Sequence, residues 1–574
     1  MKNLTVSVLA VAILALAQQQ FPRPGSAKLT DGRTLEGAIL NQSPFNTQLR
    51  TADGKVHLLV RDGEAWREPS VVPKQDWPSY DGGASGNRYS TLQQINTGNV
   101  QRLAPRWVFP LPGAPQLQGT PIVVDGIMYV TASNEAYALD AATGRQFWHY
   151  QQPRTPGLQG GAGRGANRGA ALRGDLIFMI TDHAHLIALN RWTGAKVWDT
   201  EMGDYKQGMY SATVAPLAIG DLVVSGTSGG EEGARGLLDA YYASTGERAW
   251  RFWTIPQRGD KLAETWIGSA LEHGCGTTWL TGSYDPDLDL LYWGVGNPCP
   301  DFNGDDRKGD NLYSSSVVAL RPKTGQLQWY YQFTPHDTHD WDADQPLLLV
   351  DEQWQGRPRK LLIQGSRNGF FYVLDRTNGE FLMARQYLEK LTWASGIGKD
   401  GRPILNPNQE PTLEGTLTCP AGGGGANWPS SSYHPGTKLF YFALAESCAI
   451  YKKVPEPWEA GKRFFNGTSS TPPGFVNRRF VRALDIQTGQ KVWDYPVSLG
   501  GLGGGGVLST AGGLVFHGDA SGAFLALDAK SGKPLWHFDS NQTWSAQPMT
   551  YMVAGKQYVT IANAGGFFSF GLTD

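Results

Sequence analysis

The chain has 574 residues, a formal net charge of -2, 40% hydrophobic and 18% charged residues. The chain has neither an excess of basic residues nor a run of Lys and Arg, which nucleic-acid-binding proteins use to contact phosphates, so no nucleic-acid partner is expected. The 72 glycines and 20 tryptophans indicate a globular, turn-rich protein. Its length exceeds the usual ~100–200 residues per domain, so it holds either several domains or one large architecture with an accessory piece.

Residues 1–17 have the pattern of a secretory signal peptide. Lys2 precedes an apolar run that ends at Ala15, Leu16 and Ala17. The alternative, a membrane anchor, requires ~20 apolar residues, and this run is shorter. We therefore expect a cleaved signal, export to the periplasm and no membrane span.

The chain has four cysteines, an even number that export would allow to form disulfides. All of them lie at or after position 275, and no C-x-x-C-H haem attachment motif occurs. The sequence therefore predicts a protein without covalently bound haem.

Residues 26–66 alternate apolar and polar positions between Asp-Gly turns. This pattern predicts a small five-strand barrel of the Sm-like or SH3-like type, with an irregular β-rich extension as the alternative. A proline-rich linker around "REPSVVPKQDWPSYDGG" separates it from the remaining region, 75–574.

One phrase recurs through region 75–574: an apolar strand end, a Thr-Gly-type turn and a second strand carrying Trp or another large apolar residue. "ALDAATGRQFW" and "ALDIQTGQKVW" are two examples. The units contain Trp107, Trp148, Trp198, Trp250, Trp329, residues 373–383, Trp493 and Trp536. Eight units of ~40–50 residues predict an all-β, eight-bladed propeller. A solenoid is the alternative, but glycine-rich turns without helical periodicity favour radial closure.

Five motifs follow in order: "TSGGEEGARG", "GCGTTW", "GVGNPCP", "PHDTHDWDA" and "SRNGFFYVLDR". Together they resemble the quinoprotein alcohol dehydrogenases, eight-bladed propellers that hold pyrroloquinoline quinone (PQQ) and a metal ion. The resemblance covers roughly residues 75–574. It implies an exported enzyme that oxidises a primary alcohol to an aldehyde and passes electrons to a separate soluble cytochrome c. The oligomeric state stays open, with a homodimer as one possibility.

The resemblance assigns Glu231 and Asn297 as metal ligands and Asp340 as catalytic base and ligand. Asp342 falls where lanthanide-using members carry an additional ligand. Hard oxygen ligands suit Ca²⁺ or a trivalent lanthanide better than Zn²⁺. We therefore expect a lanthanide site, with Ca²⁺ as the alternative.

The segment 332–346 allows two other interpretations. A slipped register would make Asp342 the base and Asp344 the ligand, at the cost of a two-residue insertion. His336 and His339, three residues apart beside carboxylates, could instead bind a transition metal.

The flat, anionic cofactor requires stacking surfaces and donors around its rim. Trp279 matches the stacking indole of the family, although a blade-core tryptophan is the alternative. Matches to rim residues are Arg168, Thr213, Ser228, Gly229, Gly230, Thr277, Arg367 and Asn427. Gln118 is also expected to contact the cofactor, at a position where relatives often carry Glu. The chain departs from the family at Ala162 and Gly163, which replace adjacent cysteines, and near Gly504, which replaces an axial tryptophan.

The resemblance also implies a disulfide between Cys419 and Cys448, where the family carries a matching bridge. Cys275 and Cys299 lie in the two motifs that converge on the cofactor and are expected to pair as well, with two reduced thiols as the alternative. A rival function is a non-catalytic propeller scaffold of the outer-membrane assembly type. Such scaffolds lack the metal and quinone residues, so catalysis is the favoured interpretation.

Overall fold

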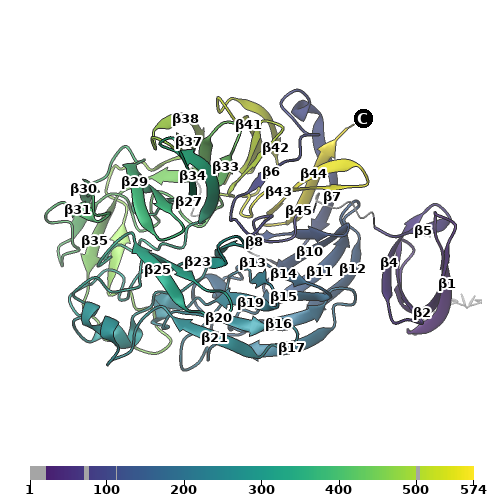
Figure 1. The fold of residues 1–574 in the computed structure, drawn as a ribbon, viewed down its shortest axis with the longest axis horizontal. Coiled ribbons are helices and arrows are strands. Elements are labelled where there is room, and N and C mark those ends of the chain that lie inside the picture. The colour runs from purple at the N-terminus through teal and green to yellow at the C-terminus, as the bar shows by residue number, and fades with distance from the viewer. Residues whose placement is uncertain (1–20, 70–75, 112, 115, 499–503, 574) are drawn as a thin grey trace, which may run out of the picture. The chain divides into compact units, whose positions relative to one another are not determined.

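The computed structural model describes residues 21–69, 76–111, 113–114, 116–498 and 504–573. The predicted signal peptide, residues 1–17, lies outside these ranges. The described residues form mainly antiparallel sheets joined by loops and five short helices (Figure 1). The chain divides into two compact units, Met1–Pro69 and Ser70–Asp574.

The first unit is one antiparallel sheet in the order β1-β2-β3-β4-β5. Its strands are β1 (Arg23–Lys28), β2 (Thr34–Gln42), β3 (Asn46–Thr51), β4 (Val56–Asp62) and β5 (Ala65–Arg67). A bridge between Leu29 and Trp66 connects the end of β1 to β5. Both side chains are buried in a small apolar core that includes Ile39 and Leu49. The predicted alternation of apolar and polar residues therefore reflects one face that packs inward.

The second unit consists mainly of four-stranded antiparallel sheets that follow one another along the chain. The first sheet contains β9 (Ile122–Val124), β10 (Ile127–Ala132), β11 (Glu135–Asp140) and β12 (Gln146–Gln151), and the second contains β14 (Ala171–Arg173), β15 (Leu176–Ile180), β16 (His185–Asn190) and β17 (Lys196–Glu201). The third sheet contains β18 (Leu217–Ile219), β19 (Leu222–Gly226), β20 (Leu237–Tyr242) and β21 (Arg248–Trp253), and the fourth contains β22 (Ser283–Asp285), β23 (Leu290–Gly294), β24 (Ser316–Leu320) and β25 (Leu327–Gln332).

The later sheets follow the same meander, and two of them recruit an N-terminal strand. One sheet contains β26 (Leu348–Trp354), β27 (Arg357–Gly365), β28 (Phe370–Asp375) and β29 (Glu380–Gln386), and the next contains β33 (Ser432–His434), β34 (Leu439–Glu446), β37 (Arg478–Asp485) and β38 (Lys491–Val497). The third of these sheets combines β39 (Val507–Thr510), β40 (Leu514–Gly518), β41 (Ala523–Asp528) and β42 (Pro534–Asp539) with β6 (Tyr89–Ser90). The last combines β43 (Met549–Val553), β44 (Lys556–Asn563) and β45 (Gly566–Leu572) with β7 (Leu103–Pro110).

Short elements join these sheets. They are the parallel pair β8 (Leu117–Thr120) and β13 (Asn167–Gly169); β30 (Ala394–Ile397) with β31 (Pro403–Leu405); β32 (Thr416–Thr418), β35 (Ala449–Lys453) and β36 (Gly467–Ser470); and the helices η1 (Val100–Arg102), α1 (Gly160–Gly163), η2 (Gly230–Glu232), η3 (Lys261–Thr265) and η4 (Ala270–His273). No helix in the described ranges is long and apolar enough to cross a bilayer.

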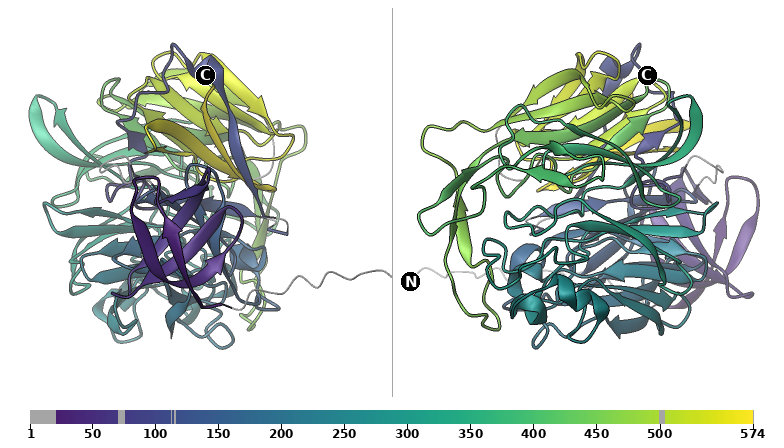
Figure 2. Two further views of the ribbon diagram at one scale, coloured as in Figure 1. Left: turned by 90° about the vertical axis from the view of Figure 1, so that its right-hand side faces the viewer. Right: turned by 60° about the vertical axis from the view of Figure 1, so that its left-hand side comes forward.

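The two ends of the second unit meet in one sheet. Strand β7 pairs antiparallel with β45, with Trp107 opposite Ser569, and Figure 2 shows the blue β7 beside the yellow C-terminal strands. The Trp536 indole also donates a hydrogen bond to the carbonyl of Leu103. The sheets therefore close into a ring, as in a propeller, and the open solenoid was the wrong alternative.

The repeated phrase is explained by packing between neighbouring sheets. Trp148, at the outer strand of one sheet, donates its indole N–H to the carbonyl of Arg191 in the next sheet, 2.8 Å away. The ring also lies against Gly194, where φ is +74° and an added Cβ would come within 2.7 Å of the indole. The Thr-Gly turn thus needs glycine both for its left-handed backbone and for contact with tryptophan.

Candidate active site

Every residue that the sequence predicts for the base, the metal and the cofactor lines one cavity of about 670 Å³ in the second unit. The predicted lining residues are Gln118, Arg168, Thr213, Ser228, Gly229, Gly230, Glu231, Thr277, Trp279, Asn297, Asp340, Asp342, Arg367 and Asn427. They are far apart in the sequence, and the ring of sheets brings their loops together. This convergence defines the candidate active site.

The polar residues of the cavity come from loops that connect strands. Glu231 belongs to η2, which follows β19, and Asn297 follows β23. Asp340 and Asp342 lie between β25 and β26, and Arg367 lies in the turn between β27 and β28. Glu231, Asn297 and Arg367 therefore lie between the second and third strands of their sheets, whereas Asp340 and Asp342 lie in the connection between two sheets.

Asp340 is held in an unusual backbone conformation with φ +64°, in the left-handed region that aspartate tolerates better than most residues. Arg367 Nη1 donates hydrogen bonds to its carboxylate oxygen Oδ1 at 3.0 Å and to its carbonyl oxygen at 2.7 Å. The Asp340 side chain keeps 32% of its exposure, and this exposed part faces the cavity. The residue is therefore fixed by its neighbours and accessible to a ligand.

Burial raises the pKa of Asp340 well above its usual range. The arginine Arg367 opposes this shift, whereas the carboxylates of Asp342 and Glu231 add to it. Repulsion among carboxylates in a poorly solvated cavity makes a bound cation favourable, because the cation would relieve it.

Asp342 is buried, and both of its carboxylate oxygens accept hydrogen bonds. The backbone N–H of Asn297 donates to Oδ1 at 2.7 Å, and the indole of Trp279 donates to Oδ2 at 3.1 Å. Arg367 Nη2 lies 2.8 Å from the same oxygen. Arg367 therefore links the two aspartates, and Asp342 fixes the stacking tryptophan predicted from the sequence.

Several buried polar atoms around the cavity have no hydrogen-bond partner among the described residues. They include the acceptor Glu231 Oε2 and the donors Arg168 Nε and Arg367 Nε. Leaving such atoms unpaired costs about 1–3 kcal/mol each. An acceptor beside carboxylates fits a hard cation, and the arginine donors fit an anionic, oxygen-rich cofactor.

Aromatic rings and Arg168 form a second part of the cavity. The Arg168 guanidinium carbon lies 4.8 Å from the Trp279 ring centroid and 5.0 Å from that of Trp428. Burial lowers the pKa of Arg168 to about 10, so it stays charged at neutral pH. These rings give the cavity flat surfaces suited to a planar ligand.

Sequence reasoning missed two buried acids near the metal candidates. Glu232 lines the cavity beside Glu231, and burial raises its pKa to about 7. Asp301 is 1% exposed, and burial with the charges of Asp340 and Glu231 raises its pKa well above the usual range. In the sequence, only their positions could have indicated these acids: Glu232 directly follows Glu231, and Asp301 comes four residues after Asn297.

The two alternatives for segment 332–346 have less support. Asp344 is 2% exposed and is not among the described residues that line the cavity. This agrees with the ungapped register, in which Asp344 is not a ligand. His336 Nδ1 lies 3.1 Å from the Gly309 carbonyl and His339 Nε2 lies 3.0 Å from that of Gln409. Over the ranges that the structure describes, no three His, Cys, Asp or Glu side chains are close enough for a preformed metal site, and this holds for Glu231, Asp340 and Asp342 as well as for the histidines.

Both predicted disulfides are confirmed. Cys419 pairs with Cys448 and Cys275 with Cys299. The sulfurs of the second bridge lie 2.7 and 3.1 Å from the carbonyl oxygen of Gly230. This bridge therefore supports the backbone that presents Glu231.

Ala162, Gly163 and Gly504, the positions at which the sequence departs from the family pattern, are not among the described residues that line the active-site cavity. Ala162 is fully buried, and Gly160 and Gly161 line the cavity in its place. An added Cβ on Gly160 would lie 3.5 Å from Glu231 Oε2. Gly504 does not line this cavity but an adjoining one. The glycines leave this part of the cavity wall without side chains.

Comparison with known proteins gives a consistent result. The family model "Glucose/ethanol/alcohol dehydrogenase, beta-propeller domain" of the PQQ proteins matches residues 77–387 and 494–559. The quinoprotein alcohol dehydrogenase PedH of Pseudomonas putida is 35% identical over 89% of this chain and 90% of its own. The quinohemoprotein alcohol dehydrogenase of Comamonas testosteroni is 36% identical over 86% of this chain and 73% of its own.

Solved structures agree with these relatives. The crystal structure of the Comamonas testosteroni enzyme has a TM-score of 0.83 at 33% identity, covering 88% of this chain and 81% of the other. A europium-containing methanol dehydrogenase has a TM-score of 0.79 at 32% identity, covering 86% and 90%. The chain therefore belongs to the family of PQQ-dependent alcohol dehydrogenases with a β-propeller fold.

Proposed function

We propose that this enzyme oxidises a primary alcohol to the aldehyde in the periplasm, with PQQ and a lanthanide ion, and passes the electrons to a separate soluble cytochrome c. The observation that carries the proposal is the meeting of Glu231, Asn297, Asp340 and Asp342 in one cavity. The scaffold alternative is not favoured, because similar chains over most of this length are named alcohol dehydrogenases.

The residues present fit both bound groups. Glu231, Asn297, Asp340 and Asp342 supply the hard oxygen ligands for the cation. Arg168, Arg367 and the rim residues Gln118, Thr213, Ser228, Gly229, Gly230, Thr277 and Asn427 supply donors and close backbone contact, and Trp279 supplies a stacking surface. When bound, PQQ and its cation provide an acceptor for the hydride from the carbinol carbon.

Asp340 removes the proton of the substrate hydroxyl as the hydride leaves the carbon. An ionised carboxylate within hydrogen-bond reach of the hydroxyl is a competent base. Arg367 keeps that carboxylate oriented through its hydrogen bond to Oδ1, and a bound cation favours the ionised form that burial alone disfavours. The proton therefore ends on Asp340, and the aldehyde is released.

The choice of a lanthanide over Ca²⁺ rests on charge. With a cation bound, Glu231, Asp340 and Asp342 would place three carboxylates around it, and PQQ would add its own, against the positive charges of Arg168 and Arg367. A trivalent ion balances this excess better than a divalent one. The similarity to a europium-containing methanol dehydrogenase points in the same direction.

We also propose that the propeller has eight blades and that the small β module of residues 26–66, within the first unit, is a closed barrel of the Sm-like or SH3-like type. Support for the blades comes from the repeated outer strands that carry Trp148, Trp198, Trp250 and their equivalents. Support for the barrel comes from the bridge between Leu29 and Trp66.

Reconstitution tests the function directly. The purified chain is loaded with PQQ and either La³⁺ or Ca²⁺, and oxidation of a panel of primary alcohols is followed with an artificial electron acceptor and with soluble cytochrome c. We expect aldehyde formation that requires PQQ and is faster with La³⁺. Tight PQQ binding without turnover of any alcohol under either metal would contradict the proposal.

A further inference from the structure

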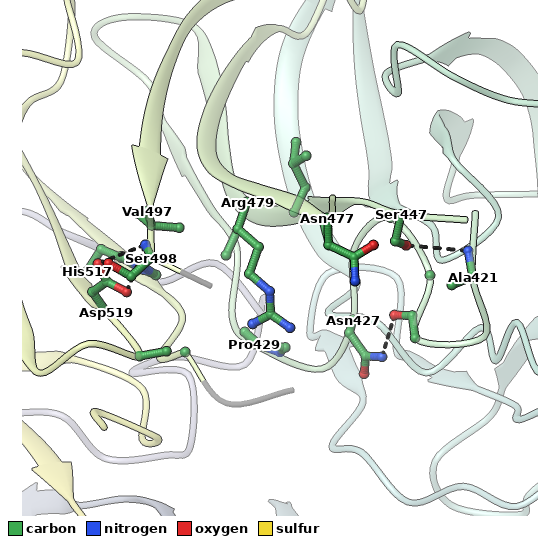
Figure 3. A pocket seen from close by; sticks show the side chains of 18 residues that line it. Ala421, Asn427, Pro429, Ser447, Asn477, Arg479, Val497, Ser498, His517 and Asp519 are labelled. Atoms are coloured by element: carbon green, nitrogen blue, oxygen red, sulfur yellow. Dashed lines mark hydrogen bonds between the residues drawn. The ribbon is translucent and has the colours of Figure 1, made fainter. Parts of the chain in front are cut away.

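A second cavity of about 190 Å³ adjoins the active site (Figure 3). Gly423 and Asn427 line both cavities, so the two spaces share a wall. We call this space the side chamber. Its volume is below the about 300 Å³ typical of a pocket for a whole drug-sized ligand. It therefore suits part of a molecule whose other end lies in the active site.

The shared wall includes part of the glycine run 422–425: Gly423 lines both cavities, and Gly424 and Gly425 line the side chamber. An added Cβ on Gly422 would lie 3.7 Å from Asp340 Oδ2, and one on Gly424 would lie 2.7 Å from Arg367. Because these positions lack side chains, the backbone lies directly beside the proposed base. A chain attached to the reacting carbon could pass along this wall.

One side of the chamber is apolar. Leu444, Ala443, Val497, Pro429 and Ala520 line it. These side chains come from β34, from the end of β38 and from neighbouring loops. Such a surface favours methylene groups and would not hold a fully polar ligand.

The chamber also holds a cation without a direct partner. Arg479 lines it, and Figure 3 shows its guanidinium between Asn427 and the pair His517 and Asp519. Among the described residues no hydrogen bond or ion pair reaches this guanidinium, and Asp519 is the only charge recorded as acting on it. Half-buried arginine donors with no acceptor favour an anionic ligand.

Asp519 does not neutralise this cation by contact. Its carboxylate accepts the backbone N–H of Ser498 at 3.2 and 3.1 Å and that of Ser521 at 3.3 Å. Burial lowers the pKa of His517 to about 4, so His517 is neutral at pH 7. Asn477 contributes a buried amide oxygen without a partner among the described residues. Over the described residues, Arg479 is thus the cation of the chamber that no side chain contacts, and Asp519 acts on it only through its charge.

We propose that the side chamber binds the tail of the substrate, and that the preferred substrates are primary alcohols with a carboxylate at the far end of an aliphatic chain. The methylene groups would contact Leu444 and Val497, and the carboxylate would accept hydrogen bonds from Arg479. This inference rests on the proposed function, because it requires the hydroxyl end to reach Asp340.

The test compares kcat/KM for 4-hydroxybutanoate, 6-hydroxyhexanoate and 8-hydroxyoctanoate with the alkanols of equal length, using the reconstituted enzyme. We expect a preference for at least one hydroxy acid. Arg479→Gln should lower the ratio of hydroxy acid to alkanol by about 10- to 100-fold, the range for loss of a charge-assisted hydrogen bond. Arg479→Glu should reverse the preference toward 6-amino-1-hexanol, and the change should appear mainly in KM.

Arg478→Gln is the matched control. Arg478 is the neighbouring residue, but it is exposed and pairs with Glu389 on the surface, so the ratio should not change. Thermal unfolding confirms that each variant folds, and hexanoate, which cannot be oxidised, should protect wild type against unfolding more than Arg479→Gln. Equal kcat/KM for hydroxy acids and alkanols in wild type would overturn the inference while leaving alcohol oxidation intact. Failure to oxidise any alcohol would instead reject the proposed function.

Discussion

At the scale of single residues, the active site is organised by Arg367, which contacts both Asp340 and Asp342. Replacing Asp340 with Asn removes the base but keeps a similar shape. We expect kcat to fall by about 10²–10⁴-fold with either La³⁺ or Ca²⁺, the usual range for loss of a general base. PQQ binding, measured by absorption, should persist. Turnover near the wild-type rate in Asp340→Asn would show that another group takes the proton.

The role of Asp342 is separable from that of Asp340. Asp342→Ala removes one negative charge from the proposed metal site, so the ratio of activity with La³⁺ to activity with Ca²⁺ should fall to about one or below. The same change leaves the Trp279 indole and the Asn297 N–H without their acceptors, so thermal unfolding must accompany the kinetics. Full lanthanide preference in a folded Asp342→Ala protein would place Asp342 outside the metal shell.

Glu232 predicts a pH dependence for the metal-free protein. Its pKa rises from 4.5 to about 7 on folding, because burial and the charge of Glu231 disfavour ionisation. The folded state therefore binds more protons than the unfolded state, so this stability is complete below about pH 4.5 and is lost as the pH rises through 7. The loss amounts to about 3 kcal/mol. Urea unfolding from pH 4.5 to 8 should show a flatter profile for Glu232→Gln, and an unchanged profile would contradict this assignment.

At the scale of elements, contact between a tryptophan and a turn glycine joins neighbouring sheets. Gly194→Ala puts a Cβ within 2.7 Å of the Trp148 ring at φ +74°. We expect a loss of about 2–4 kcal/mol, from left-handed strain and overpacking together. Gly220→Ala is the matched control, since Gly220 has φ +59° and nothing within 4 Å of the added Cβ; it should lose only about 1–2 kcal/mol. Equal losses in urea unfolding would show that the contact adds nothing.

At the scale of the whole molecule, the two compact units should be separable. Deleting residues 1–69 removes the first unit but keeps β6 and β7, so the propeller should unfold at the same temperature and retain alcohol oxidation. Deleting residues 1–110 also removes the partner of β45 and exposes a sheet edge, so this protein should aggregate or fail to fold. Loss of folding in the shorter deletion would show that the units depend on each other.

Short local patterns were enough to predict much of this molecule. The turn glycines and strand tryptophans showed the repeat, because each unit needs the same contact to its neighbour. The motifs around Glu231, Asn297 and Asp340 pointed to the site through their resemblance to the quinoprotein family, and the structure brings these residues to one cavity. The disulfide partners could also be named, since both pairs lie in those motifs or flank Asn427.

The sequence alone thus determined a strand-rich repeat protein, its family and the residues that line its cavity, because these features are encoded within short segments. Only the tertiary structure decided how the ring closes, since Trp536 donates to Leu103, a residue 433 positions away. It also decided that Arg367 joins both aspartates, that Asp301 lies near them and Glu232 beside Glu231, and that Arg479 lines a chamber adjoining the active site. These features depend on long-range packing, which fixes burial and charge neighbours that no local pattern records.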